Sequence, residues 1–95
     1  MNNRELCFRL ANRSDTALIL QFIKELADYE KMADEVVANE QLLEEWIFDK
    51  QKAEVIFAVA DGKEVGFALF FHNFSTFLGR SGIYLEDLYI KPEYR

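Results

Sequence analysis

The chain has 95 residues, of which 51% are hydrophobic and 15% aromatic, so it is expected to fold as one small globular domain. Its net charge of −6 argues against nucleic acid as a partner, because general nucleic-acid binding needs a basic surface. No apolar run is long enough to span a membrane, and a single cysteine with no signal-peptide pattern before it indicates a cytoplasmic protein.

The first half of the chain predicts a strand followed by two helices. Residues 7–11 form a short extended run, and Ser14 and Asp15 are both suitable N-caps for a helix over residues 15–31. Apolar residues recur at helical spacing in that range: Ile19, Phe22, Ile23, Leu26 and Ala27. A second helix is expected over residues 40–48, capped by Asn39, with Trp46 packing it against the rest of the domain.

Strands follow in the second half. Residues 55–60 are apolar on both faces, as expected of a central strand. A tight turn at Asp61-Gly62 leads into an antiparallel partner strand over residues 65–71. Gly66 within this partner indicates a bulge or the close approach of another backbone.

The region after this hairpin is expected to be a loop and then a final strand. Residues 72–81 contain serine, asparagine, glycine and aromatic residues that look exposed, which is the composition of a loop. His72 has no second histidine and no cysteine near it, so no metal site is expected there. The final strand is expected to end at Ile90, because Pro92 cannot continue a hydrogen-bonded ladder.

Two adjacent carboxylates, Glu86 and Asp87, interrupt the apolar pattern of the final strand. Adjacent strand residues point to opposite faces, so the two side chains cannot be hidden in the same way. Burying an unpaired carboxylate is costly unless the group finds a partner or its pKa rises. The strand is therefore expected to be either an edge with one wet face or the floor of a site.

A second acidic group lies at the end of the first predicted helix. It comprises Asp28, Tyr29, Glu30, Asp34 and Glu35. Negative charge at a helix C-terminus opposes the macrodipole, so the group fits either a solvated helix end or a mouth that attracts an amine. The residues alone favour the solvated helix end.

The predicted order, β-α-α-β-β-β, describes an α/β (α+β) domain with a mostly antiparallel sheet and two helices. Two of its segments are distinctive: residues 23–30, IKELADYE, and residues 84–95, YLEDLYIKPEYR. Together they resemble the GCN5-related N-acetyltransferases (the GNAT family), and within that family the diamine (spermidine/spermine) and thialysine acetyltransferases. The resemblance covers nearly the whole chain and implies the N-terminal part of the GNAT fold.

The resemblance implies acetyl transfer from acetyl-CoA to a primary amine of a small cationic substrate, either a polyamine or a thialysine-like amino acid. In the family the pantetheine arm of the cofactor lies against main-chain groups of the fourth strand, which here would be those of Leu88, Tyr89 and Ile90. An unpaired strand edge suits such an amide-bearing ligand, and an N–H could also stabilise the developing oxyanion. Arg95 matches the first position of the loop that holds the pyrophosphate of CoA.

The resemblance also implies an amine site. The polyamine-binding positions fall on Tyr29, Glu30 and Glu86, and Asp87 is expected to contact the same substrate or a helix. Glu86 is the expected catalytic residue, because a carboxylate can hold the ammonium group and accept the proton that the amine loses before attack. Without the resemblance, Glu86 reads better as a solvent-facing residue at a sheet edge.

The family's remaining parts lie beyond Arg95: the glycines of the pyrophosphate loop, a further helix and strand, and a tyrosine that acts as general acid. Residues 1–95 are therefore expected to be a single domain that is the N-terminal portion of a GNAT domain, with little acetyl transfer of its own. The resemblance implies a homodimer, and a complementary C-terminal chain would also complete the fold. The expected exposed edge along residues 84–90 favours strand pairing between chains.

Two functions remain open at this point. The first is an N-acetyltransferase of a small primary amine. The alternative is a non-catalytic α/β binding or interaction module that keeps the half-fold without the cofactor loop. A glycine-x-glycine pattern encoded directly after Arg95 would favour the enzyme, and a stop codon there would favour the module.

Overall fold

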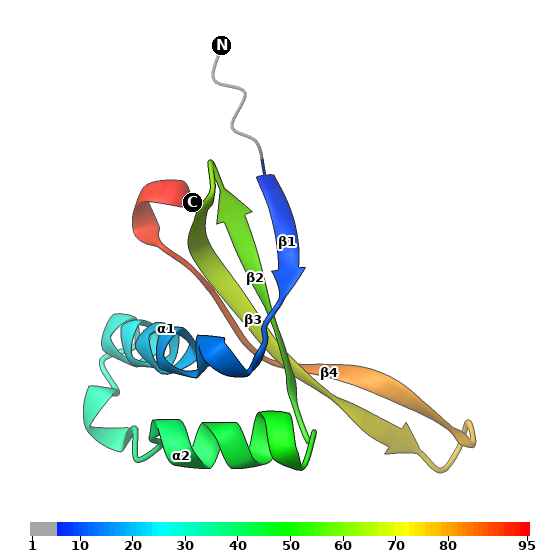
Figure 1. The fold of residues 1–95 in the computed structure, drawn as a ribbon. Coiled ribbons are helices and arrows are strands. Elements are labelled where there is room, and N and C mark those ends of the chain that lie inside the picture. The colour runs from blue at the N-terminus through cyan, green and yellow to red at the C-terminus, as the bar shows by residue number, and fades with distance from the viewer. Residues whose placement is uncertain (1–5) are drawn as a thin grey trace.

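The computed structural model describes residues 6–95, which form a four-stranded antiparallel sheet with two helices packed on one face (Figure 1). The strands neighbour one another in sequence order: β1 (Leu6–Leu10), β2 (Glu54–Ala60), β3 (Lys63–Ser75) and β4 (Arg80–Ile90). The predicted order of elements, the antiparallel sheet and the strand end at Ile90 are confirmed. Within the described part of the chain, no helix has the length and apolar character needed to cross a membrane.

The first helix, α1 (Thr16–Tyr29), is shorter than predicted and follows a 3₁₀ turn at Arg13–Asp15. The cap of this segment is Asn12, whose side chain accepts a hydrogen bond from the N–H two residues later at 3.0 Å. Asp15 stands before α1 but makes no capping bond to it. Its carboxylate instead binds the guanidinium of Arg9 at 2.8 Å, which ties the helix entry to β1.

The second helix, α2 (Glu40–Leu43), runs directly into a π-helical turn, Glu44–Asp49. The predicted cap is confirmed, because the Asn39 side chain accepts a hydrogen bond from the Leu42 N–H at 2.8 Å. This bond satisfies one of the donors that the first turn of a helix leaves without an internal partner.

The expected packing role of Trp46 is wrong. Its side chain is 47% exposed, and the buried residue of the π-helical turn is Ile47. A π turn is wider than an α turn and changes which residues face inward. Trp46 lies instead beneath Lys50, whose Nζ is 4.0 Å from the ring centroid.

The main core lies between the helices and one face of the sheet. Phe22 of α1 is fully buried, and its ring centroid is 5.6 Å from that of Phe67 and 6.0 Å from that of Phe57. Burial of one such side chain is worth about 1.5–3 kcal/mol. These aromatic contacts therefore hold α1 against β2 and β3.

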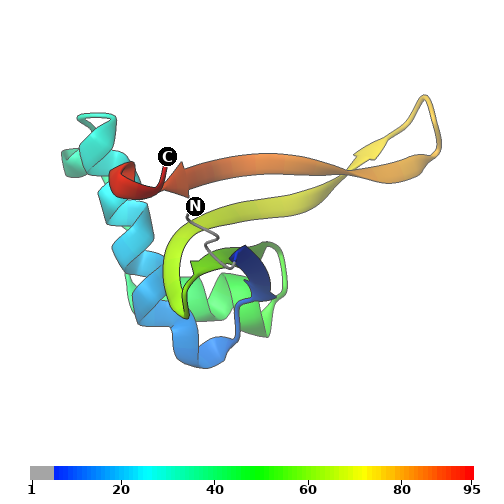
Figure 2. The same ribbon diagram turned by 90° about the horizontal axis from the view of Figure 1, so that it is seen from above.

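The loop predicted over residues 72–81 is too long, because only residues 76–79 form a turn. β3 continues to Ser75 and β4 begins at Arg80, so the two strands form a ribbon that projects beyond β1 and β2 (Figure 2). His72 therefore lies inside a strand. Contacts between side chains on the two strands outweigh the loop-like composition. One example is the stacked pair of Phe71 and Tyr84, whose ring centroids are 5.1 Å apart.

The other face of the sheet is apolar and is only partly covered, where Ile90 and Tyr94 pack against the buried residues Ala58, Ala60 and Val65. Phe8 of β1 is 65% exposed there, and a groove of about 460 Å³ lies between β1 and the last two residues of the chain. Its lining consists of Leu6, Phe8, Ala58, Ala60, Val65, Ile90, Tyr94 and Arg95. Contiguous exposed apolar surface of this kind is uncommon on monomeric soluble proteins.

Candidate functional site

The end of α1 is fixed by a residue in the left-handed conformation. Lys31 has a φ of 59°, and its N–H donates to the carbonyl of Asp28 at 3.0 Å. A left-handed residue after the last turn ends a helix sharply. This termination places Tyr29 and Glu30 beside β4, where the ring of Tyr29 contacts that of Tyr89 and the charge of Glu30 acts on Asp87.

β4 carries a β-bulge at Glu86. Leu69 of β3 lies opposite Asp87 and the next residue, Phe70, lies opposite Leu85, so Glu86 is the extra residue of β4. A bulge bends the strand and interrupts the alternation of side chains. The expectation that Glu86 and Asp87 point to strictly opposite faces holds for a regular strand, and β4 is irregular here because of the bulge.

Three carboxylates predicted to bind substrate lie close together. The pKa of Asp87 is raised first by its burial and then by the negative charges of Glu86 and Glu30. The effect of Glu30 means that the end of α1 and the bulge of β4 lie near each other. The charges of the exposed Glu30 and Glu86 repel that of the half-buried Asp87, and a bound cation relieves that repulsion.

We expect Asp87→Asn to stabilise the chain near neutral pH. The pKa of Asp87 in the folded chain is raised above its ordinary value of 3.8, so ionisation disfavours the folded state. This cost is absent below the ordinary pKa, develops as the pH rises and is complete above the folded pKa. Thermal unfolding at about pH 7 should show a Tm about 2–4 °C higher for the variant, with no difference at about pH 3. Equal Tm values at the higher pH would contradict the repulsion.

Aromatic rings next to this cluster stack with Arg95. Its guanidinium carbon is 4.3 Å from the ring centroid of Tyr29 and 5.5 Å from that of Tyr89. The two tyrosine rings meet edge to face at 6.4 Å. Tyr29 and Arg95, two predicted site residues far apart in the sequence, are thus brought together at the end of β4.

The pairing of β4 shows which main-chain groups are directed to its open edge. The N–H of Lys91 donates to the carbonyl of Val65 at 2.8 Å. This bond lies next to the pair formed by Gly66 and Ile90. In an antiparallel ladder such a pair is a non-hydrogen-bonded pair. The main-chain groups of Ile90 therefore point away from β3.

The three residues whose main-chain groups are predicted to contact the cofactor therefore differ in the direction of those groups. Because pair types alternate along a ladder, the groups of Leu88 and Ile90 face the open edge and those of Tyr89 face β3. The carbonyl of Ile90 accepts a hydrogen bond from Nε of Arg95 at 2.8 Å. A ligand at this edge would find the groups of Leu88 and the N–H of Ile90 directed toward it.

Sequence reasoning missed a network that joins β4 to α1. Nζ of Lys91 lies 3.1 Å from both carboxylate oxygens of Glu25, which also accepts a hydrogen bond from the side chain of Gln21. Burial and then the charge of Glu25 raise the pKa of the nearby Tyr89. Two spacings could have indicated this network. Lys91 follows Tyr89 by two positions and so shares its strand face, and Glu25 follows the buried Phe22 by three positions on the helix.

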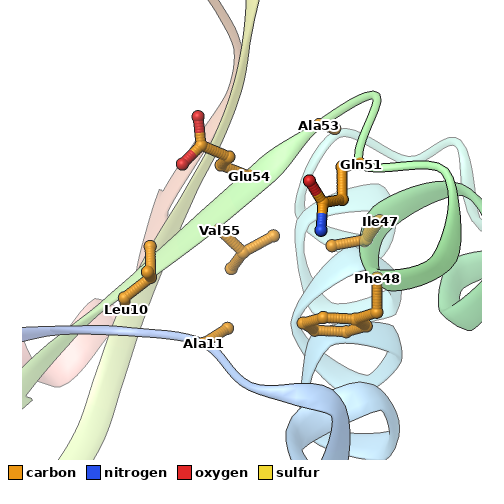
Figure 3. A pocket seen from close by; sticks show the side chains of 8 residues that line it. All are labelled: Leu10, Ala11, Ile47, Phe48, Gln51, Ala53, Glu54 and Val55. Atoms are coloured by element: carbon orange, nitrogen blue, oxygen red, sulfur yellow. The ribbon is translucent and has the colours of Figure 1, made fainter.

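A separate cavity of about 400 Å³ lies between the end of β1, the start of β2 and the π-helical turn (Figure 3). Its lining is mostly apolar: Leu10, Ala11, Ile47, Phe48, Gln51, Ala53, Glu54 and Val55. None of the predicted site residues lines it. Among residues 6–95, no group of three or more histidine, cysteine, aspartate or glutamate side chains is arranged to hold a metal ion.

Known proteins resemble the chain in sequence. No family model matches it. It is similar to thialysine N-epsilon-acetyltransferases from Bos taurus, at 40% identity, and from Sus scrofa, at 41% identity. Each alignment covers 92% of this chain and 56% of the relative, so the chain spans about half the length of these curated relatives.

Solved structures resemble it in fold. A ribosomal-protein-alanine N-acetyltransferase from Brucella melitensis biovar Abortus 2308 gives a TM-score of 0.73 at 19% identity, over 96% of this chain and 61% of that one. A "predicted acetyltransferase with acetyl-CoA" from Clostridium acetobutylicum gives 0.71 at 15% identity, over 96% and 63%. At such identities the likeness shows the fold alone. The described residues therefore have the fold of the GNAT acetyltransferases, and the resemblance to that family is confirmed in sequence by the thialysine N-epsilon-acetyltransferases.

Proposed function

We propose that the complete gene product is an N-acetyltransferase that moves an acetyl group from acetyl-CoA to a primary amine of a small cationic substrate, a thialysine-like amino acid or a polyamine. The observation that carries this proposal is that the charges of Glu30 and Glu86 both act on Asp87, beside the open edge of β4. The similarity to proteins named thialysine N-epsilon-acetyltransferases supports the same class of reaction.

In this proposal the acidic cluster binds the charged substrate and prepares it for attack. Glu30 and Asp87 attract the ammonium groups of the substrate, and the ring of Tyr29 packs over an ammonium group. Glu86, which is exposed, accepts a proton from the attacking amine, directly or through water. The amine nitrogen then bonds to the acetyl carbon, the carbon–sulfur bond breaks, and the thiolate leaves and takes up a proton.

The open edge of β4 would hold the cofactor. Acetyl-CoA supplies the activated acetyl group, and its extended, amide-bearing arm suits the outward main-chain groups of Leu88 and Ile90. Tyr89 contributes by its buried ring, which fixes the strand. Arg95 places a positive charge at the end of this edge, where it would interact with the phosphates of the cofactor.

The test is an assay of the complete gene product with acetyl-CoA and a panel of amines: thialysine, lysine, spermidine and a short diamine. Release of free CoA is measured, and a monoamine of matched length serves as the control for the second positive charge. We expect transfer to at least one dication at a higher kcat/KM than to the monoamine. The absence of transfer to every amine would contradict the proposal.

A second candidate is a non-catalytic interaction module, and the partly uncovered apolar face around Phe8 is the observation that favours it. Calorimetric titration with acetyl-CoA separates the two, because the module has no need to bind a cofactor.

We further propose, on the family resemblance, that the protein forms a homodimer. Sedimentation equilibrium of the complete gene product tests that state.

A further inference from the structure

We propose that Glu25 and Lys91 are positioning residues that hold the end of β4 in the geometry needed to bind acetyl-CoA. The inference rests on the proposed function, because the groups being positioned are the main-chain groups of Leu88 and Ile90 on the open edge. Neither Glu25 nor Lys91 need touch the cofactor or the amine, and both act through the strand.

Lys91 lies where β4 ends and is held in two places. Its main-chain N–H donates to the carbonyl of Val65 on β3 at 2.8 Å. Its Nζ lies 3.1 Å from each carboxylate oxygen of Glu25 on α1. The residue that follows Ile90 is therefore tied to a strand on one side and to a helix on the other.

Tyr89 is held by burial next to the same carboxylate. Tyr89 is 6% exposed, its ring centroid is 6.3 Å from that of Phe22, and its hydroxyl lies close enough to Glu25 for the two groups to interact electrostatically. Burial, with the charge of Glu25, raises the pKa of Tyr89, so the hydroxyl stays protonated and can donate. Tyr89 and Lys91 flank Ile90, so the packing of Tyr89 against α1 and the ion pair of Lys91 with Glu25 hold the strand on both sides of it.

The pair is enclosed enough for the loss of one partner to matter. The side chains of Lys91 and Glu25 are 19% and 27% exposed, unlike the surface pairs that contribute little to stability. Burial acts to raise the pKa of Glu25, but hydrogen bonds from Gln21 and Lys91 outweigh it and lower the pKa. Without the ammonium group, a charged and poorly solvated carboxylate would remain beneath Tyr89.

To regain contact with water, the unpaired carboxylate of Glu25 would move, and the end of β4 would shift with it. Hydrogen bonds to a ligand require donor–acceptor distances of about 2.7–3.2 Å, so a shift of about 1 Å at Leu88 and Ile90 would weaken those to the cofactor. The carboxylates of the amine site lie elsewhere: Glu86 and Asp87 at the bulge of β4, and Glu30 at the end of α1. The loss should therefore fall on acetyl-CoA rather than on the amine.

The experiment is steady-state kinetics of Lys91→Met in the complete gene product. We expect the KM for acetyl-CoA to rise about tenfold or more, with the KM for the amine and kcat within about twofold of the parent. Lys91→Arg keeps a cation that can bind a carboxylate and should recover most of the loss. An unchanged KM for acetyl-CoA, or equal rises in both KM values, would overturn the assignment.

A double-mutant cycle tests whether the two residues act as one unit. Glu25→Gln keeps the shape of the side chain, and the double variant with Lys91→Met should be no worse than the worse single variant. Additive losses would overturn the pairing. Lys50→Met is the matched control, because it removes an exposed lysine–glutamate contact of 2.8 Å to Glu45, on the π-helical turn. If Lys91→Met fails to fold, Glu25→Gln carries the same kinetic test.

The two proposals can fail separately. If the parent protein binds acetyl-CoA but transfers no acetyl group, the proposed function fails, and calorimetry replaces kinetics as the test of the positioning role. Weaker binding by Lys91→Met than by the parent and by Lys50→Met then supports that role. Equal binding by all three, or no binding by the parent, overturns it.

Discussion

Glu86→Gln in the complete gene product is expected to lower kcat by about 10²- to 10⁴-fold, the usual contribution of a positioned general base. The amide keeps the size of the side chain but cannot accept a proton at neutral pH. Glu86 is exposed at the bulge of β4, so its replacement should leave the fold intact. The KM for acetyl-CoA should stay close to that of the parent.

The matched control for this variant is Glu45→Gln, which removes an exposed carboxylate on the π-helical turn. Its kcat should equal that of the parent. Kinetics at saturating amine separate a loss of catalysis from a loss of substrate binding. If Glu86→Gln turned over as fast as Glu45→Gln, Glu86 would have no part in proton transfer.

Gly66→Ala is expected to destabilise the domain by about 1–3 kcal/mol or more, the range typical of overpacking. A Cβ at this position would contact the side chain of Ile90 and would lie 2.7 Å from the carbonyl oxygen of Tyr89. A side chain can rotate away, but the Tyr89 carbonyl belongs to the ladder between β3 and β4. The added methyl group would therefore push apart the two strands at the proposed cofactor edge.

Denaturant unfolding of Gly66→Ala measures this effect, with Gly82→Ala as the control on the same pair of strands. A Cβ at Gly82 would meet only the side-chain oxygen of Asn73, at 3.1 Å, and that side chain can move. The midpoint should fall for the first variant and stay nearly constant for the second. Equal midpoints would show that the strands separate there at little cost.

The element order was predictable because local patterns specify it. Apolar spacing in α1, the cap at Asn39 and the turn at Asp61-Gly62 each depend on a few neighbouring residues, and all three are present in the structure. The close approach expected at Gly66 is also confirmed. These features need no knowledge of distant contacts.

The errors arose where distant contacts decide the structure. Most of the predicted loop became a ribbon because Phe71 finds Tyr84 across the hairpin, which the composition of either segment alone does not reveal. The bulge at Glu86 depends on how β4 pairs with β3. The prediction for Trp46 is wrong because it depends on an α-helical period, whereas this turn is π-helical.

In the candidate site, too, the sequence indicates individual residues but not the contacts between distant ones. The resemblance supplied the residue types, and the structure adds that Glu30 lies near Asp87 and that Arg95 stacks on Tyr29. The contact between Glu25 and Lys91 joins positions 66 residues apart, so no local pattern points to it directly. Identifying it required the packing of α1 against β4.

An open sheet edge can recruit a strand from a neighbouring molecule, and the bulge of β4 works against that outcome. All 17 acidic residues of the chain lie outside residues 65–85, so the outer strand reaches Leu85 without a negative charge. Glu86 and Asp87 then place two charges side by side on a bent edge, an arrangement that hinders edge-to-edge aggregation. Neutralising both would therefore lower the solubility of the protein as well as weaken its proposed grip on a cation.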